Sequence, residues 1–157
     1  MADSDISYME RTRQYYRAQG YTDDYRWAHF ESVPFTRPVK ALDQSRVTVV
    51  TTAMPGDAAS RSDREVTAVP VAPPPRRLYT DHLSWDKDNT HTRDIPSFLP
   101  LWQLAQLRDA GIIGSLAPRF YCVPTEYSQR TTIDTDAPEI LALCRQDQAD
   151  IALLVPL

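Results

Sequence analysis

The sequence predicts an α/β domain with an open, mostly parallel sheet and flanking helices, of the Rossmann or flavodoxin-like kind. Arg46–Thr52 is a β-branched run with the composition of a buried strand. Phe98–Ala110 shows the apolar periodicity of an amphipathic helix. Asp150–Leu157 is a near-continuous apolar run, which is typical of a strand at the centre of a parallel sheet. Strands that alternate with helices of this length favour βαβ units.

Shorter patterns complete the predicted sheet and end its first helix. Glu65–Val71 is a possible short strand, and strands are also expected over Leu78–Thr80 and Leu116–Val123. Gly111 is placed to end the Phe98–Ala110 helix in a left-handed conformation, and Ile112 stands where the hydrophobic contact of such a cap is usually made.

A second helix is expected to begin at Asp136. Glu139 follows three residues later, as in a capping box. The residues expected on the buried side of this helix are Ile140, Leu141 and Cys144.

The first 40 residues contain one predicted helix and an aromatic-rich stretch, without the alternation of strands and helices that follows. Ser4 or Asp5 can cap a helix that runs to about Gln19 and stops at Gly20, with Ile6, Met9 and Tyr16 near one stripe. The aromatic-rich stretch 21–35 follows and is broken by prolines. We expect residues 1–40 to form a helix and an arm that packs on the α/β domain of residues 41–157.

Composition excludes several classes of protein. The chain has 157 residues, 42% of them hydrophobic, with a formal charge of −4. A general nucleic-acid binder would carry a basic face, and the pair Arg76-Arg77 is interpreted as a solvated loop. No signal-peptide pattern and no apolar run of the roughly 20 residues that span a bilayer is present, so we expect a cytoplasmic protein without membrane or nucleic-acid partners.

The final strand raises a separate expectation. A parallel strand as apolar as Asp150–Leu157 normally has helices on both faces, and exposure costs about 25 cal/mol per Å² of apolar surface. We therefore expect either that a partner covers this strand, that it lies at a protected position, or that the fold is incomplete at the C-terminus.

Polar side chains are densest in the segment that follows Leu78–Thr80. His82 is a candidate proton donor or substrate-orienting group, because the pKa of histidine lies near neutrality, although a structural role with Asp86 is also open. No zinc-type spacing is found, so no metal is predicted. The cluster consists of Asp81, His82, Asp86, His91 and Asp94, and Trp85 within it could line a pocket.

The two cysteines form no close-spaced pair. Cys144 lies on the apolar side of the last helix, which indicates a structural thiol. Cys122 ends a strand, nearer to where a site could form, but a core or rim thiol is again the favoured interpretation.

Several segments, in order, resemble the glycine, sarcosine, betaine and D-proline reductase selenoprotein B family. Within them, His82 and Asp86 match the family's His followed four residues later by Asp, Asp94 matches its later Asp, and Gly111–Gly114 match its Gly-Ile-Ile-Gly. Pro96 stands where the family often has Asn, and residues 56–64 match only loosely. The matching segments are PFTRPVKALDQSRVTVVTTA, YTDHLSWDKDNTHTRDI, FLPLWQLAQLRDAGIIGSLAPRFY and APEILALCRQDQADIALLVPL.

The resemblance implies a redox pair directly after Leu157. In the family, the matching strand runs into a selenocysteine or cysteine, and a second cysteine follows two or three residues later. Selenocysteine is encoded by UGA, which is ordinarily read as stop, so we expect the next residue to be selenocysteine and the sequence to be a truncated translation. The alternatives are an ordinary stop and a naturally shortened relative.

The function implied is that of an oxidoreductase module with selenol or thiol chemistry on a small amino-acid-derived substrate. A thioredoxin-like thiol electron donor and a homo-oligomer are the implied partners. The 157-residue chain alone would be inactive. A non-catalytic subunit that docks through its C-terminal strand is the alternative, and a metal-dependent hydrolase centred on His82, Asp86 and His91 is a weaker third. The residues expected to line the substrate pocket are Asp81, Trp85, Tyr121, Cys122, Pro156 and Leu157.

Overall fold

The computed structural model describes residues 7–24, 26, 28–33, 36–56, 65–80, 88–89, 91–125 and 128–157. The chain divides into two compact units, Met1–Phe35 and Thr36–Leu157. The packing of an N-terminal arm on the α/β domain stays a prediction.

The first unit contains helix α1, Tyr8–Ala18. Ser7 stands at its N-cap position, and the earlier start expected at Ser4 or Asp5 falls outside the described residues. Gly20 has a φ of +89°, in agreement with its predicted role as helix stop. Arg17 Nε donates to Asp24 Oδ1 at 2.7 Å, which ties the segment after the helix to its last turn.

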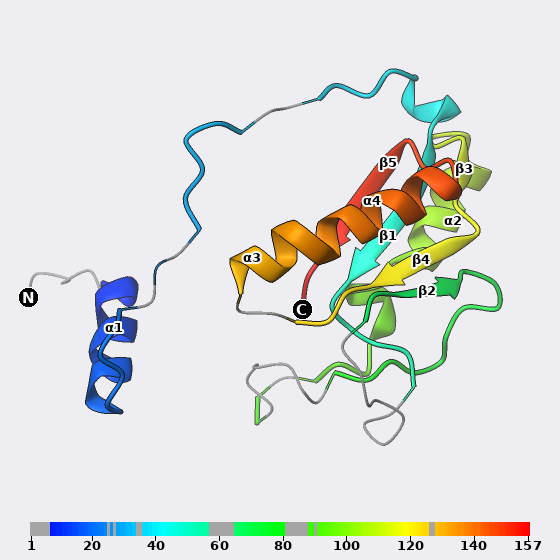
Figure 1. The fold of residues 1–157 in the computed structure, drawn as a ribbon. Helices are drawn as coiled ribbons and strands as arrows, with labels where there is room; N and C mark the ends of the chain where they lie inside the picture. Colours follow the sequence, from blue (N-terminus) through cyan, green and yellow to red (C-terminus); the bar gives the residue numbers. More distant parts are fainter. Residues whose placement is uncertain are drawn as a thin grey trace, which may run out of the picture. The chain divides into compact units, whose positions relative to one another are not determined.

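The second unit is built on an open, mostly parallel sheet, as the sequence predicts. Among the described residues it has five strands in the order β2-β4-β1-β3, with β5 also paired to β1. Figure 1 shows β1 inside the sheet, between β5 and β4. Only β2 is antiparallel to its neighbour, β4. The strands are β1 Arg46–Thr51, β2 Thr67–Pro70, β3 Ser115–Leu116, β4 Arg119–Cys122 and β5 Ile151–Val155.

The strand predicted over Leu116–Val123 is divided into β3 and β4, and both pieces pair with β1. The break falls at Ala117 and Pro118, and proline has no N–H to donate to a ladder. A side chain of β1 bridges to the second piece beside the break, because Thr48 Oγ1 donates to the carbonyl oxygen of Arg119 at 2.9 Å. The strand predicted over Leu78–Thr80 is reduced to a single bridge between Met54 and Tyr79.

Helix α2, Leu101–Asp109, begins three residues later than predicted, because a 3₁₀ turn, Ile95–Ser97, and Pro100 precede it. Its end is a Schellman motif. Gly111 has a φ of +70°, and the amide of Ile112 donates to the carbonyl of Leu107 at 2.9 Å. Ile112 stands at the predicted position after Gly111 and is 48% exposed, whereas Ile113 is buried; the apolar contact expected from Ile112 stays a prediction.

The last helix is longer than predicted. It consists of α3 Gln129–Thr131, the π-helical turn Thr132–Asp136 and α4 Ala137–Gln146. Ser128 is its cap, with Oγ accepting from the amide of Thr131 at 3.2 Å. The capping box expected at Asp136 is wrong, because Asp136 already has helical dihedral angles and makes no side-chain cap. Cys144 is buried as expected, whereas Leu141 is 49% exposed.

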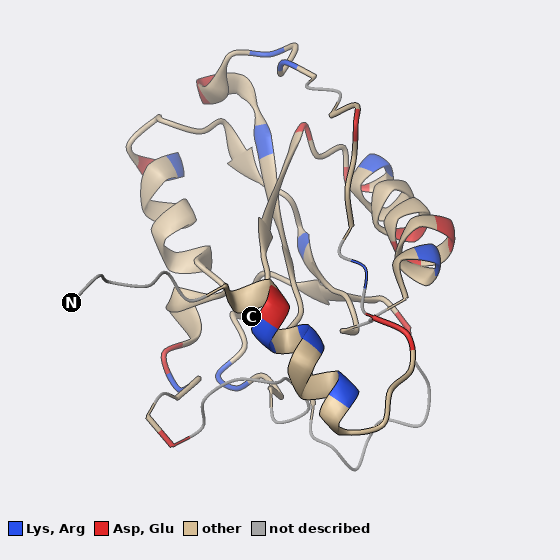
Figure 2. Cartoon of the chain, turned by 90° about the vertical axis from the view of Figure 1, so that its left-hand side faces the viewer, with Lys and Arg blue, Asp and Glu red and all other residues tan. Residues whose placement is uncertain are grey.

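The helices cover opposite faces of the sheet. Leu101 and Leu104 of α2 pack with Val47 and Val49 of β1, and Cys144 of α4 packs with Val50 on the other side. Figure 2 shows the sheet between these helices and its strands almost free of charged residues. None of the described helices is long and apolar enough to cross a membrane.

The expectation that the final strand is central is wrong. β5 pairs with β1, and no other described strand pairs with its second edge. Leu153 is 40% exposed and Leu154 is 69% exposed. The central strand is β1, in which every residue after Arg46 is buried.

Candidate functional site

The carboxyl ends of β1 and β5 lie side by side. Thr51 is the register partner of Val155, and the two strands are parallel. Beyond them, Thr52 Oγ1 accepts a hydrogen bond from the amide of Leu157 at 2.9 Å. Figure 1 shows the C-terminus beside the arrowhead of β1. In open α/β sheets this edge is where ligands bind, so the position of Leu157 is fixed at the expected place for a site.

The predicted polar cluster is described only in part. Asp81, His82, Trp85 and Asp86 lie outside the described residues. Asp94 is exposed, and its carbonyl accepts from Ser97 Oγ at 2.6 Å. Within the described ranges no group of three His, Cys, Asp or Glu side chains could hold a metal ion.

His91 takes part in a local backbone contact. Its Nδ1 accepts from the amide of Arg93 at 3.4 Å. This contact belongs to the turn that leads into the 3₁₀ segment Ile95–Ser97.

The other predicted pocket residues fall into two groups. Tyr121 and Cys122 are fully buried, Tyr121 toward α4 and Cys122 in the core on the α2 side. Pro156 is exposed, and Leu157 packs against the same core as Cys122. Thus the structure brings Cys122 and Leu157 into one cluster at this side of the sheet.

Neither cysteine forms a disulfide, and both are buried. Burial raises the pKa of the Cys144 thiol, and the nearby negative charge of Asp147 adds to this. A thiol with a raised pKa is a poor nucleophile at neutral pH. The interpretation of Cys144 as a structural thiol agrees with this environment.

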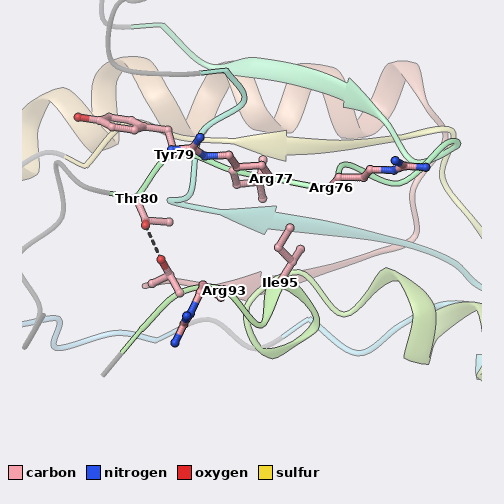
Figure 3. A pocket seen from close by; sticks show the side chains of 8 residues that line it. Arg76, Arg77, Tyr79, Thr80, Arg93 and Ile95 are labelled. Atoms are coloured by element: carbon pink, nitrogen blue, oxygen red, sulfur yellow. Dashed lines mark hydrogen bonds between the residues drawn. The ribbon is translucent and has the colours of Figure 1, made fainter. Parts of the chain in front are cut away.

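A cavity of about 440 Å³ opens between two segments of the second unit. Figure 3 shows residues 76–80 along one wall and residues 92–95 along the other. The hydroxyls of Thr80 and Thr92 are 2.6 Å apart and join the walls. The lining residues are Arg76, Arg77, Leu78, Tyr79, Thr80, Thr92, Arg93 and Ile95.

Arg76 and Arg77 are exposed residues of a loop, as the sequence predicts. They also line the cavity together with Arg93. In the sequence, the cavity is indicated only by two arginines directly before the apolar Leu78, which is buried in the structure. Arg93 could not be added from the sequence, because it reaches the cavity only through the fold.

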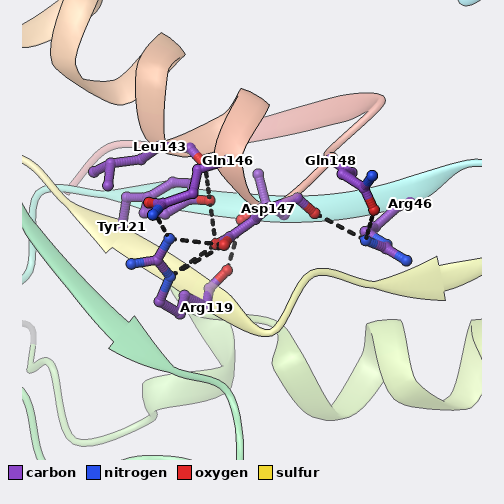
Figure 4. A network of polar contacts seen from close by, with 8 residues as sticks. Arg46, Arg119, Tyr121, Leu143, Gln146, Asp147 and Gln148 are labelled. Carbon is purple, nitrogen blue, oxygen red and sulfur yellow. Dashed lines mark hydrogen bonds and ion pairs between the residues drawn. The ribbon is translucent and has the colours of Figure 1, made fainter.

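A second polar arrangement lies at the opposite edge of the sheet (Figure 4). Arg119 donates to both carboxylate oxygens of Asp147, from Nη2 at 2.7 Å and from Nε at 2.9 Å. The hydroxyl of Tyr121 donates to Asp147 Oδ2 at 2.7 Å, and Arg46 Nη1 donates to the Asp147 carbonyl at 2.9 Å.

This arrangement is structural. Arg46 and Arg119 are the first residues of β1 and β4, so it lies at the amino ends of these strands, away from Leu157. The hydrogen bonds from Arg119 hold the pKa of the Asp147 carboxyl below its usual range. Burial and the adjacent carboxylate raise the pKa of Tyr121. Near neutral pH, an ionised Asp147 with neutral Tyr121 and charged Arg119 joins β4 to the end of α4.

Comparison with known proteins does not assign the chain to a family. No protein-family model matches the chain, no curated protein is significantly similar to it, and no solved structure matches it significantly. The geometry of the carboxyl edge and of the arginine-lined cavity is therefore the basis for any assignment of function.

Proposed function

We propose that the chain is an oxidoreductase module of the selenoprotein B type that acts on a small amino-acid-derived substrate, with its redox pair directly after Leu157. The ordered resemblance of its segments supports this function. The observation that carries it is the hydrogen bond between Thr52 and the amide of Leu157. A residue that follows Leu157 would start from a fixed point beside the ends of two parallel strands, where α/β sheets bind ligands.

The proposed pair supplies a low-pKa selenolate or thiolate that displaces the amine from the substrate carbon, and a second thiol that resolves the covalent intermediate. This step releases the reduced carbon fragment and leaves the two chalcogens joined in one oxidised bond, which a thioredoxin-like dithiol then reduces. Residues of this chain would position the redox pair. Thr52 holds the backbone of Leu157, and the core against which Leu157 packs holds its side chain. His82, as predicted from the sequence, would orient the substrate or donate a proton. A cytoplasmic location belongs to the same proposal.

The gene beyond the codon for Leu157 tests this function first. We expect UGA or a cysteine codon, followed by a second cysteine codon within three positions. The continued protein should then cleave glycine, sarcosine, betaine or D-proline in the presence of a dithiol. UAA or UAG at this codon, or a downstream frame without cysteine, would sink the proposal.

A matched pair of variants tests the role of the carboxyl edge. Thr52→Val in the continued protein removes the acceptor of the Leu157 amide and should lower the rate of cleavage. Thr67→Val makes the same change on the edge strand β2, where Thr67 is only half-buried, and should leave the rate unchanged. Equal rates for both variants would remove the support that Thr52 gives to the proposal.

The exposure of β5 favours a second candidate, a non-catalytic subunit that docks through this strand. Leu153 and Leu154 present apolar surface, and one edge of β5 has no described strand beside it. An edge strand of this kind can add a strand from another chain. We take a second copy of the protein as the occupant, because two β5 strands related by a two-fold axis would pair with the same apolar side chains.

The oligomeric state tests this candidate. The protein should elute as a dimer in size-exclusion chromatography with light scattering, and Leu154→Lys should convert it to a monomer. Leu141→Lys is the control, since Leu141 is a comparably exposed leucine on α4. A monomer at all concentrations, or equal effects of the two variants, would exclude docking of a second copy through β5.

A further inference from the structure

We infer that the cavity lined by Arg76, Arg77 and Arg93 binds a small ligand through an oxyanion group, a carboxylate or a phosphate. The inference does not depend on the reductase function. It rests on the charge of the cavity, on the rigidity of its walls and on its place in the fold.

Within the part of the chain that the structure describes, the positive charge of the cavity is unbalanced. Among the described residues, no carboxylate forms an ion pair with Arg76, Arg77 or Arg93. By contrast, Arg108 is paired with Asp109 and Arg119 with Asp147. Like charges that line one cavity repel one another, and a bound anion removes that repulsion.

The walls are held by the core. Leu78 is 6% exposed and Thr80 is 2% exposed, so the backbone between the arginines and the Thr80–Thr92 contact is anchored. Tyr79 is fixed as well, because its amide donates to the carbonyl of Met54 at 2.7 Å and its own carbonyl accepts from the Met54 amide at 3.0 Å. The cavity is therefore preformed, while the arginine side chains on its rim remain free to turn.

The arginines come from both walls. Figure 3 shows Arg76 and Arg77 on the wall that carries Thr80, with Arg93 on the facing wall beyond the hydrogen bond between the two threonines. Their guanidinium groups point away from one another. A ligand oxyanion would draw them inward, and the planar fork of arginine matches both carboxylate and phosphate oxygens.

The cavity also has a place and a size that suit a ligand. Leu78 and Ile95 line the cavity, and Leu78 belongs to the core cluster against which Ile95, Val155 and Leu157 pack. Its volume of about 440 Å³ falls in the range that small-molecule sites occupy, roughly 300–1,000 Å³. A compact anionic group therefore fits the cavity.

Titration with inorganic phosphate and with acetate tests the inference, at an ionic strength held constant with chloride. We expect saturable shifts of the amide NMR signals of Thr80 and Thr92 with at least one of the two anions. Saturation with phosphate alone would identify a phosphoryl group, and saturation with acetate a carboxylate. No saturable shift with either anion, or shifts spread evenly over the protein, would overturn the inference.

Charge-removing variants identify the residues that bind. Arg77→Gln and Arg93→Gln should each weaken binding of the anion about tenfold, as the loss of one charge-assisted hydrogen bond does. Arg108→Gln is the control, because Arg108 is an exposed arginine of α2 that pairs with Asp109, and it should bind as the wild type does. Both arginines are exposed, so the folded state should persist, which circular dichroism checks. Equal affinity in all variants would overturn the assignment of the cavity.

Discussion

Gly111 and Gly114 lie in one turn, yet the structure requires glycine at each for a different reason. At Gly111 the backbone has a φ of +70°, and an added Cβ would meet no atom within 4 Å. At Gly114 an added Cβ would lie 2.6 Å from the carbonyl carbon of Gln44 and 2.9 Å from the carbonyl oxygen of Asp43. The first position is limited by its backbone conformation, and the second by a lack of space against the backbone of residues 43–44, which would have to shift.

Alanine at the two positions should therefore have unequal effects. Gly111→Ala should lower the free energy of unfolding by about 1 kcal/mol, which is the conformational cost of a left-handed residue. Gly114→Ala should lower it by about 3 kcal/mol, since the loop before β1 must shift to admit the methyl group. Urea unfolding followed by circular dichroism measures both. A larger loss for Gly111→Ala would contradict the close approach of residues 43–44 to Gly114.

At the scale of elements, Asp147 joins β4 to the end of α4. Asp147→Asn removes the charge that Arg119 and Tyr121 bind, and should lower the free energy of unfolding by about 2 kcal/mol near neutral pH. Asp109→Asn breaks a pair with Arg108 on the surface, where Asp109 is 68% exposed, and should change stability by less than about 0.5 kcal/mol.

The effect of Asp147→Asn should also depend on pH. The pKa of Asp147 is lower in the folded protein than its unfolded value of about 3.9. Its stabilisation is therefore complete above about pH 5 and is lost as pH falls through the folded pKa. Urea unfolding of the two proteins should give a constant difference from pH 5 to 7 and a shrinking one below about pH 4. A difference that grows on acidification would show that the carboxylate is not the stabilising form.

The elements show which features could be predicted from the sequence. β1 and the Gly111 end of α2 were predicted because β-branched composition and a helix-ending glycine act over a few neighbouring residues. The start of the last helix was misplaced, since Asp136 and Ser128 are both good caps and only tertiary packing decides between them. The position of β5 was also missed, because apolar composition does not distinguish a strand with two neighbours from one with a single neighbour.

For the molecule as a whole, the sequence predicted the mostly parallel sheet, whereas a site at the carboxyl ends of its strands stays a prediction. The carboxyl edge follows from parallel strands, and β1 and β5 do end together. The arginine-lined cavity could not be predicted, because Arg77 and Arg93 belong to separate segments that meet through the Thr80–Thr92 contact. The ion pair between Arg119 and Asp147 at the opposite edge was not predicted for a similar reason, since Arg119 lies in β4 and Asp147 at the end of α4.

Thr52 follows β1, and Leu157 follows β5, so the hydrogen bond between them joins the carboxyl ends of these two strands. This hydrogen bond should control how often the end of β5 opens. Thr52→Val keeps the shape of the side chain but removes the acceptor that the Leu157 amide uses at 2.9 Å. The loss of about 1 kcal/mol of local stability corresponds to an approximately fivefold change in an opening equilibrium. Hydrogen exchange at the Leu157 amide should therefore be about five times faster in Thr52→Val than in the wild type, while exchange in β1 stays the same. Thr67→Val should change neither rate. If exchange at Leu157 is equally fast in the wild type and in Thr52→Val, the end of β5 is not held by Thr52, and the geometry on which the proposed redox site depends is absent.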